Sequence, residues 1–471
     1  MLHSKFISAG ATALSIALLS TTALADEKVY AGFPVTVKGY TGDKTTSVSY
    51  GGQVARHALH DSLKVIAGKG SGKADPGLKA QMMTYFEGKD PERVIIAPQS
   101  KGKFVIKQIK VGELSKSTNL AGKTYGGAIT GMPNAMTGAE LVNFWIDKAS
   151  ASDGGQDTSN GYDYPQLISK FIMGAVFYNQ VVDGYLDEYL EADKKPNDKP
   201  YRDGAPYTGK EHAWDEAFGY FGAPAHTLTL SPAEVYDIAK RKDEAMTWAD
   251  YNQDGMVDLK SEMVFGPAYY AAGFDKGGKT EYLHTIVKAF LDGRKLLTSA
   301  KGEKLTDAQR AELKGYAKTI ADTWQRVLAE ATFKYAGEVY EDMVKLQTIM
   351  EANGETEKML KTYIKHWGEL KGFALALQTG KNNLGETGTK LNRMMGFGPL
   401  LPNRSQVVDV DSDGNYMRDQ GSSWGEYMLH MAKVQQLMID EFGVVARSHD
   451  VTGEMKGLAN ALGGKSTAEN D

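Results

Sequence analysis

The feature that most constrains the fold is an internal repeat. Residues 212–220 read His-Ala-Trp-Asp-Glu-Ala-Phe-Gly-Tyr, and residues 366–373 read His-Trp-Gly-Glu-Leu-Lys-Gly-Phe. Two further pairs of segments match in the same order along the chain: Gly-x-Val at 174–176 and 337–339, and Asp-rich segments that begin at Asp250 and Asp409. Because three matches keep their order at similar separations, the sequence predicts a duplicated unit whose two copies pack together.

The repeated units are predicted to be helical. Apolar residues recur at three- and four-residue spacings, which marks one face of a helix, in five long segments: 164–191, 279–300, 306–350, 356–378 and 422–442. Capping boxes, in which a hydroxyl and a carboxylate or amide satisfy the opening N–H groups of a helix, begin at Thr137, Ser231 and Thr306. A short β-like run followed by Gly-rich loop is expected as an insertion at about 93–135.

These patterns predict an all-α fold of two four-helix-bundle-like units. With 471 residues, the chain is too long for one hydrophobic core. We expect an N-terminal half at 26–275, which carries the small β and loop insertion, and a C-terminal half at 276–471.

Composition excludes several classes of site and partner. The chain has no cysteine, so it cannot form disulfides, iron–sulfur clusters or zinc–thiolate sites. Any metal must be held by oxygen or imidazole. The formal net charge is −5 and no block of Lys and Arg stands out, so no nucleic-acid partner is expected.

The first 25 residues have the pattern of a secretory signal peptide. Lys5 supplies a positive charge, residues 6–19 are mostly apolar, and Ala23-Leu24-Ala25 is typical of a cleavage site. We predict cleavage after Ala25 and export to the periplasm. No later segment is apolar over the roughly 20 residues that a bilayer requires, so the protein is not expected to span a membrane.

The repeat also carries candidate metal ligands. In a helix, His212 and Glu216 project from one face, and so do His366 and Glu369. One imidazole and one carboxylate from each half could together bind iron, zinc or manganese if the halves face each other. The alternative is that the His and Trp side chains fill aromatic cores while each Glu pairs locally.

Two Asp-rich segments resemble calcium loops. The first places oxygen donors at alternate positions, followed by a late Glu: Asp250, Asn252, Asp254, Met256 through its carbonyl, Asp258 and Glu262. Ser261 occupies the twelfth position, where the standard loop has Glu. The second has Asp409, Asp411, Asp413 and Asn415, with Gln420 at its twelfth position. Calcium is predicted to brace both loops; the alternative is Asx-type turns held by side-chain-to-backbone bonds.

Several motifs together resemble a known family. They are Tyr-Gly-Gly-Gln-Val-Ala-Arg at 50–56, Tyr-Pro-Gln at 164–166, and the two His-Trp-Glu segments. As a set, they are similar to the imelysin-like family of exported bacterial proteins, especially its branch catalogued as a domain of unknown function. The resemblance covers about residues 45–445.

The resemblance implies an all-helical fold of two related bundles, with a site where they meet. It also implies a link to iron or haem acquisition at the envelope, and the founding member was described as a metallopeptidase. The family signature G-x-H-x-x-E places its His on His212 and its Glu on Asp215, with Lys210 where the family has Gly. Asp215 therefore joins Glu216 as a candidate acidic ligand.

The leading hypothesis is a non-enzymatic periplasmic protein that binds a metal ion or a small metal complex. Iron or zinc would be held by His212, Asp215, Glu216, His366 and Glu369, and envelope iron-uptake components would be partners. A second hypothesis is a peptidase-like metallohydrolase, with Glu216 or Asp215 as general base on a metal-bound water. A third is a structural or interaction module in which the His-Trp-Glu repeats are core packing.

Overall fold

The computed structural model of the protein describes residues 27–381 and 384–463. The predicted signal peptide at residues 1–25 lies outside the described residues.

The described residues form fourteen α-helices, which confirms the predicted all-α class. They are α1 (Gly51–Ala67), α2 (Pro76–Phe86), α3 (Gly138–Ala151), α4 (Tyr164–Ile172), α5 (Gly209–Phe221), α6 (Pro232–Lys240), α7 (Met246–Ala249), α8 (Gly266–Asp275), α9 (Tyr282–Ser299), α10 (Asp307–Glu351), α11 (Glu357–Ala376), α12 (Gly385–Met395), α13 (Trp424–Phe442) and α14 (Met455–Ala461).

Strands are few in the part of the chain that the structure describes. Two antiparallel two-stranded sheets are present: β1 (Gln156–Asp157) with β2 (Tyr162–Asp163), and β3 (Ser405–Val410) with β4 (Tyr416–Gln420). The expected insertion at 93–135 contains short 3₁₀ turns and isolated bridges, such as the bridge between Val94 and Lys110. This segment is therefore loop-rich, as predicted.

Local sequence signals account for where the helices begin. The three predicted capping boxes are present at Thr137, Ser231 and Thr306, which open α3, α6 and α10. A fourth, formed by Thr208 and Glu211, opens α5. After α4 the chain continues as π-helix, through η4 (Met173–Tyr178) and η5 (Gln180–Tyr185), so it stays helical over most of the predicted segment 164–191.

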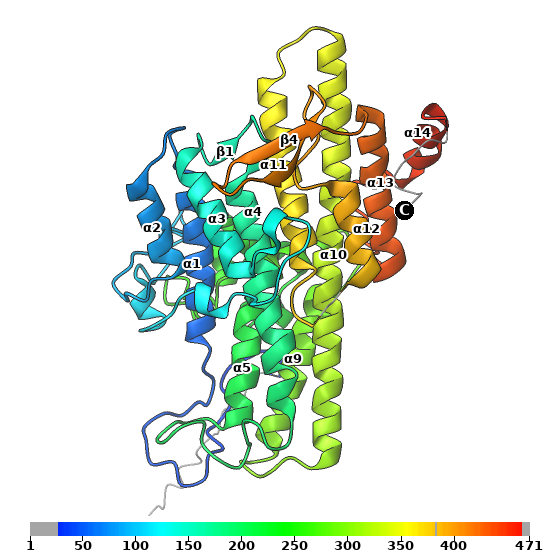
Figure 1. The fold of residues 1–471 in the computed structure, drawn as a ribbon. Helices are drawn as coiled ribbons and strands as arrows, with labels where there is room; N and C mark the ends of the chain where they lie inside the picture. The colour runs from blue at the N-terminus through cyan, green and yellow to red at the C-terminus, as the bar shows by residue number, and fades with distance from the viewer. Residues whose placement is uncertain (1–26, 382–383, 464–471) are drawn as a thin grey trace, which may run out of the picture.

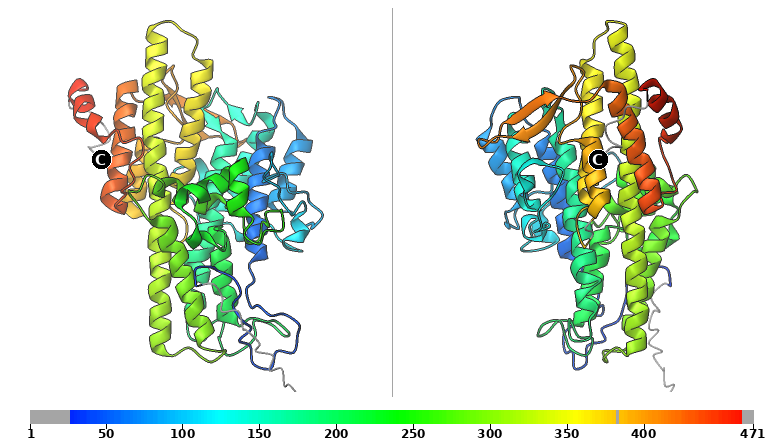
Figure 2. Two further views of the ribbon diagram at one scale, coloured as in Figure 1. Left: turned by 180° about the vertical axis from the view of Figure 1, so that it is seen from behind. Right: turned by 45° about the vertical axis from the view of Figure 1, so that its right-hand side comes forward.

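The 45-residue helix α10 organises the molecule. At about 1.5 Å per residue it is roughly 68 Å long, and it runs along most of the long axis of the protein (Figure 1). In the view from behind, α9 lies beside its lower part and α11 beside its upper part (Figure 2). It also contacts α8 and α13.

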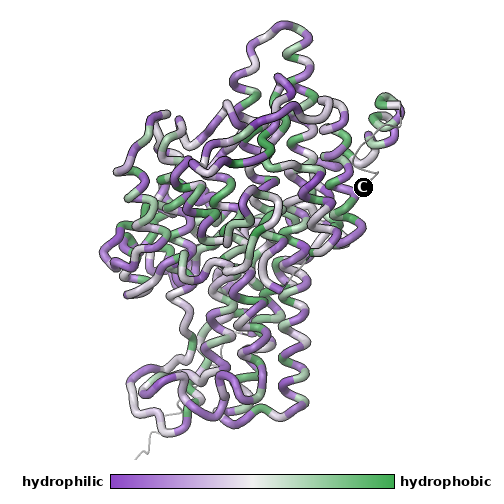
Figure 3. Tube along the Cα trace, in the orientation of Figure 1, coloured by the Kyte–Doolittle hydropathy of each residue, from purple (hydrophilic) through white to green (hydrophobic). Residues whose placement is uncertain are grey.

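Helices from the two halves of the sequence pack against each other. The expected boundary at residues 275 and 276 falls between α8 and α9. Across it, α4 packs against α11, and α5 packs against α9. Polar and apolar residues are interspersed along these helices (Figure 3), and each helix directs its apolar stripe toward the neighbours it contacts.

The tryptophans of both repeat segments lie in the core. Trp214 and Trp367 are fully buried. Trp214 Nε1 donates to the carbonyl of Phe290 at 2.8 Å, and Trp367 Nε1 donates to the hydroxyl of Tyr427 at 2.8 Å. Each indole therefore buries its apolar area without losing its hydrogen bond. Within the described ranges, no helix is long and apolar enough to cross a membrane.

Candidate metal centre

The first repeat segment forms most of α5, and its His and Glu pair with each other. His212 Nε2 lies 3.6 Å from Glu216 Oε1, and Gln53 donates to the same Glu at 2.8 Å. The imidazole stacks on Tyr207, with ring centroids 4.4 Å apart, and also contacts Tyr201. Burial lowers the pKa of His212, while the nearby Glu216 carboxylate opposes that shift. The imidazole thus projects from α5 into a cluster with two tyrosines of the segment that precedes this helix.

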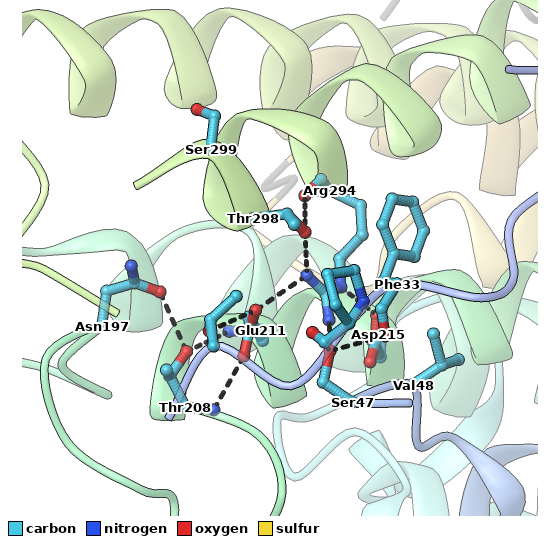
Figure 4. A network of polar contacts seen from close by, with 12 residues as sticks. Phe33, Ser47, Val48, Asn197, Thr208, Glu211, Asp215, Arg294, Thr298 and Ser299 are labelled. Atoms are coloured by element: carbon cyan, nitrogen blue, oxygen red, sulfur yellow. Dashed lines mark hydrogen bonds and ion pairs between the residues drawn. The ribbon is translucent and has the colours of Figure 1, made fainter. Parts of the chain in front are cut away.

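Asp215 belongs to a different environment, a fully buried ion-pair network (Figure 4). Its Oδ1 accepts from Arg294 Nε at 2.9 Å and from the hydroxyl of Tyr30 at 2.8 Å, and its Oδ2 accepts from the Ser49 N–H at 3.1 Å. Arg294 Nη1 also donates to Glu211 at 3.0 Å. Burial raises the pKa of Asp215 to about 6, and the Arg294 guanidinium opposes that rise.

These contacts give Asp215 a structural role. Both of its carboxylate oxygens accept hydrogen bonds, and a metal ion would have to displace the buried Arg294 guanidinium to reach Oδ1. The same hydrogen bonds also occupy the oxygens that Asp215 would need to act as a general base. Asp215 is therefore a residue that links α5 to α9.

The second repeat segment lies on α11, and its candidates meet two acidic residues of α10. Ligand atoms of Glu338, His366 and Glu369 all lie within 4.8 Å of one another. His366 Nε2 is 3.6 Å from Glu338 Oε2. Glu338 precedes Asp342 by one turn on α10, and His366 precedes Glu369 by one turn on α11, so both pairs face the contact between the two helices.

Asp342 orients the His366 ring. The distance from His366 Nδ1 to Asp342 Oδ2 is 2.6 Å, and the Asp342 side chain is 2% exposed. Nδ1 is thus held by this buried carboxylate, and Nε2 faces Glu338 and is the nitrogen placed to bind a metal. Metal-binding histidines commonly have their second nitrogen held by a carboxylate in this way.

A second histidine reaches the group from the C-terminal segment. His449 Nε2 lies 3.3 Å from Glu338 Oε1, and His449 Nδ1 lies 3.0 Å from Glu341 Oε1. It therefore repeats the arrangement of His366: one ring nitrogen faces Glu338 while the other is held by a carboxylate. His449 has a positive φ of 57°, which places it in a tight turn against α10.

Three lysines pair with the carboxylates of this group. Glu369 lies 3.4 Å from Lys170 and 3.3 Å from Lys365, and Lys334 lies 2.7 Å from Glu338. Although burial alone would raise the pKa of Glu369, Lys170, Lys365 and Lys64 together hold it at about 2. Glu369 is therefore ionised at neutral pH, as a metal ligand must be.

The structure brings together two of the five predicted metal ligands. His366 and Glu369 are in the group, whereas His212, Asp215 and Glu216 lie outside this group among the described residues. Sequence reasoning missed Glu338, Asp342 and His449. A signal for Glu338 was present, because it is the central residue of the repeated Gly-x-Val segment at 337–339. No sequence pattern pointed to His449.

The first Asp-rich segment forms a closed loop between α7 and α8. Asp250 accepts from the N–H groups of Asp254 and Gly255 at 3.0 and 2.9 Å. Glu262, one place later than in the standard loop, still reaches back to accept from Asn252 and Asp258. These are the bonds expected of an Asx-type turn, and Lys107 pairs with Asp254. Calcium in this loop stays a prediction.

The second Asp-rich segment is built differently. Asp409 lies on β3, and Asp411, Asp413 and Asn415 form the exposed turn to β4. Asp411 Oδ1 accepts from the N–H groups of Asp413 and Asn415 at 2.9 and 2.8 Å. The third matched pair of the repeat thus has two unlike structures, a loop between helices and a hairpin turn. Calcium here also stays a prediction.

Comparison with known families matches residues 154–248 to a domain of unknown function, DUF4856. The matched segment runs from β1 to α7, so it includes His212, Asp215 and Glu216 but none of the group on α10 and α11. It covers well under half of the chain. Comparisons with curated proteins and with solved structures gave no match.

Proposed function

We propose that this protein binds a transition-metal ion, iron or zinc, through Glu338, His366 and Glu369, with His449 as a fourth donor. The observation that carries the proposal is the close approach of the three donors within 4.8 Å, with His366 oriented by Asp342 at 2.6 Å. One or two imidazoles with carboxylates suit iron, zinc and manganese.

Partial exposure of two donors supports uptake of an ion from solution. The side chains of His366 and Glu338 are 18% and 14% exposed, so an ion can reach them, while Glu369 and Asp342 are buried behind them. A metal would replace Lys170, Lys334 and Lys365 as the counter-charge of the carboxylates. A lysine can move into solvent only where its side chain is exposed. Lys365 is therefore the first of the three lysines that we expect to leave its carboxylate.

The wider role that we propose is that of an exported imelysin-like binding protein. It would act in metal or haem acquisition in the periplasm, alongside envelope iron-uptake components. The motif resemblance and the signal-like first 25 residues support this role. Binding is favoured over hydrolysis because Asp215 is engaged by Arg294 and Glu216 by Gln53.

Metal titration tests the site. Metal-free protein is titrated with Zn²⁺ and, without oxygen, with Fe²⁺ in a calorimeter. We expect about one tight site per chain, lost in His366→Ala and weakened roughly 10- to 100-fold in Asp342→Asn, which leaves the direct donors in place. His284→Ala is the matched control, because His284 on α9 bonds to the Leu230 carbonyl outside the group.

Two results would contradict the proposal: no uptake of either metal, or equal uptake by His366→Ala and the native chain. We also propose that calcium braces the loop at 250–262. Titration with Ca²⁺ should therefore show binding that Asp250→Ala weakens and His366→Ala leaves unchanged, which separates the calcium loop from the metal centre.

A further inference from the structure

A pocket of about 260 Å³ lies between α1, α4, α6 and α8. Lys64 and Lys170 contribute to its wall from α1 and α4, and Lys240 and Arg241 contribute from the end of α6. None of Glu338, His366 and Glu369 lines it. The pocket is therefore distinct from the proposed metal centre, although Lys170 contacts both.

Positive side chains are concentrated in the wall of this pocket. Lys64 and Lys170 both line it, from the contacting helices α1 and α4, and Lys170 is 4% exposed. Lys170 pairs with Glu369 behind the wall, at 3.4 Å. Among the described residues, Lys64 donates to no carboxylate or carbonyl oxygen. Burial, followed by the charge of Lys170, lowers the pKa of Lys64 to about 7.

The pocket supplies little negative charge to balance these lysines. Asp61 is the acidic residue of its wall, and its carboxylate lies 2.9 Å from His60 Nδ1. Lys240 lies over the Tyr269 ring at 4.7 Å, and Arg241 donates to the Gln99 carbonyl. Glu369, outside the pocket, supplies one negative charge to Lys170, but the wall itself carries four cationic side chains against the single carboxylate of Asp61. An anion in the pocket would be attracted by this excess of positive charge.

Most of the remaining wall is apolar. It includes Met173, Met263, Val264 and Phe265, together with the rings of Tyr269 and Tyr270. The volume lies just below the range of about 300–1,000 Å³ that is typical of pockets for drug-sized ligands. The pocket thus combines a cationic end with a compact apolar body, which matches a small organic molecule with one anionic group.

We infer that this pocket binds a small organic anion, with its carboxylate or phosphate between Lys64 and Lys170 and its apolar body against Met173, Met263 and Phe265. Charge-assisted hydrogen bonds to two ammonium groups would supply most of the affinity. Inorganic anions of the same charge would bind less tightly than the organic anion, because they make no apolar contacts with this wall.

Calorimetry tests this inference on metal-free full-length protein at constant ionic strength. The probes are benzoate, succinate, phenyl phosphate and inorganic phosphate. We expect about one site per chain for benzoate or phenyl phosphate. Lys64→Met should weaken binding by about tenfold or more, the loss of one charge-assisted bond. Lys79→Met on α2, where Lys79 pairs with exposed Asp147, is the control and should bind as the native chain does.

The arms of the experiment separate the possible ligands. Benzoate binding alone identifies a carboxylate, and phenyl phosphate binding alone identifies a phosphate ester. The inference is overturned if no probe binds at millimolar concentration, if inorganic phosphate binds as tightly as phenyl phosphate, or if Lys64→Met binds equally well. A thermal melt of Lys64→Met by circular dichroism confirms that the variant is folded.

Discussion

At the residue scale, the guanidinium of Arg294 forms ion pairs with two carboxylates, those of Glu211 and Asp215. All three side chains are fully buried, and Arg294 also donates to Ser47 and Thr298. Charges removed from water are stable only when their partners are complete. This network therefore connects α9 to α5 and to the extended segment that contains Ser47.

Removing the guanidinium should be costly. Arg294→Met leaves two buried carboxylates without their cation, so we expect the free energy of unfolding to fall by about 3–5 kcal/mol. Urea denaturation followed by circular dichroism measures it. The control is Lys288→Met on the same helix, because its exposed pair with Asp292 should contribute less than about 1 kcal/mol. Equal losses in the two variants would contradict the structural role of Arg294.

His57 should make stability depend on pH. Burial lowers its pKa to about 3, and the ring stacks on Phe265 with centroids 4.8 Å apart. The folded state keeps it neutral, whereas the unfolded state takes up a proton below about pH 6.5. Its contribution is therefore complete above pH 6.5 and is lost as the pH falls toward 3.

Between pH 7.5 and 5.0 this loss amounts to about 2 kcal/mol. The native chain should lose that much more stability over this interval than His57→Gln, whose amide does not titrate. Urea denaturation at the two pH values measures the difference. A His57→Gln variant with the same pH dependence as the native chain would show that His57 is not the group responsible.

At the element scale, two glycines of α10 differ in the space around them. A Cβ on Gly315 would meet nothing within 4 Å, whereas a Cβ on Gly337 would lie 1.9 Å from the His449 carbonyl oxygen. Gly337 therefore allows the C-terminal segment to lie directly on α10. That contact is also what brings His449 to Glu338.

Alanine at each position tests this reading. Gly315→Ala should stabilise the protein by about 0.5–1 kcal/mol, because it only removes backbone freedom from the unfolded chain. Gly337→Ala should destabilise it and should also weaken metal binding at the proposed centre, because His449 must move away. Thermal melts and the metal titration give both values. A Gly337→Ala variant that melts like Gly315→Ala would show that the close approach is not required.

At the scale of the whole molecule, the two halves of the sequence share their cores. The apolar face of α4 is covered by α11, and that of α5 by α9, although each pair spans the expected boundary at 275 and 276. The Trp214 indole, for example, is enclosed with Phe290 of α9. Neither half buries its helices with its own residues alone.

Separate halves should therefore fail to fold. Produced alone, residues 26–275 and 276–471 should each give circular dichroism spectra of low helicity with no cooperative melt, because each would expose a large apolar surface. Mixing the two should restore helicity. A cooperative melt of either half by itself would show instead that the halves are independent domains.

The sequence by itself predicted the long helices and the beginnings of α3, α6 and α10 at their capping boxes. These properties depend on periodicity and capping over a few residues, which local chemistry decides. Only the tertiary structure decided that Asp215 pairs with Arg294, that Glu338 faces His366, and that His449 reaches Glu338. Each contact joins residues far apart in sequence, and its formation depends on how whole helices pack. For the same reason, the site was expected to draw its ligands from both halves, whereas the structure groups Glu338, His366 and Glu369 on α10 and α11.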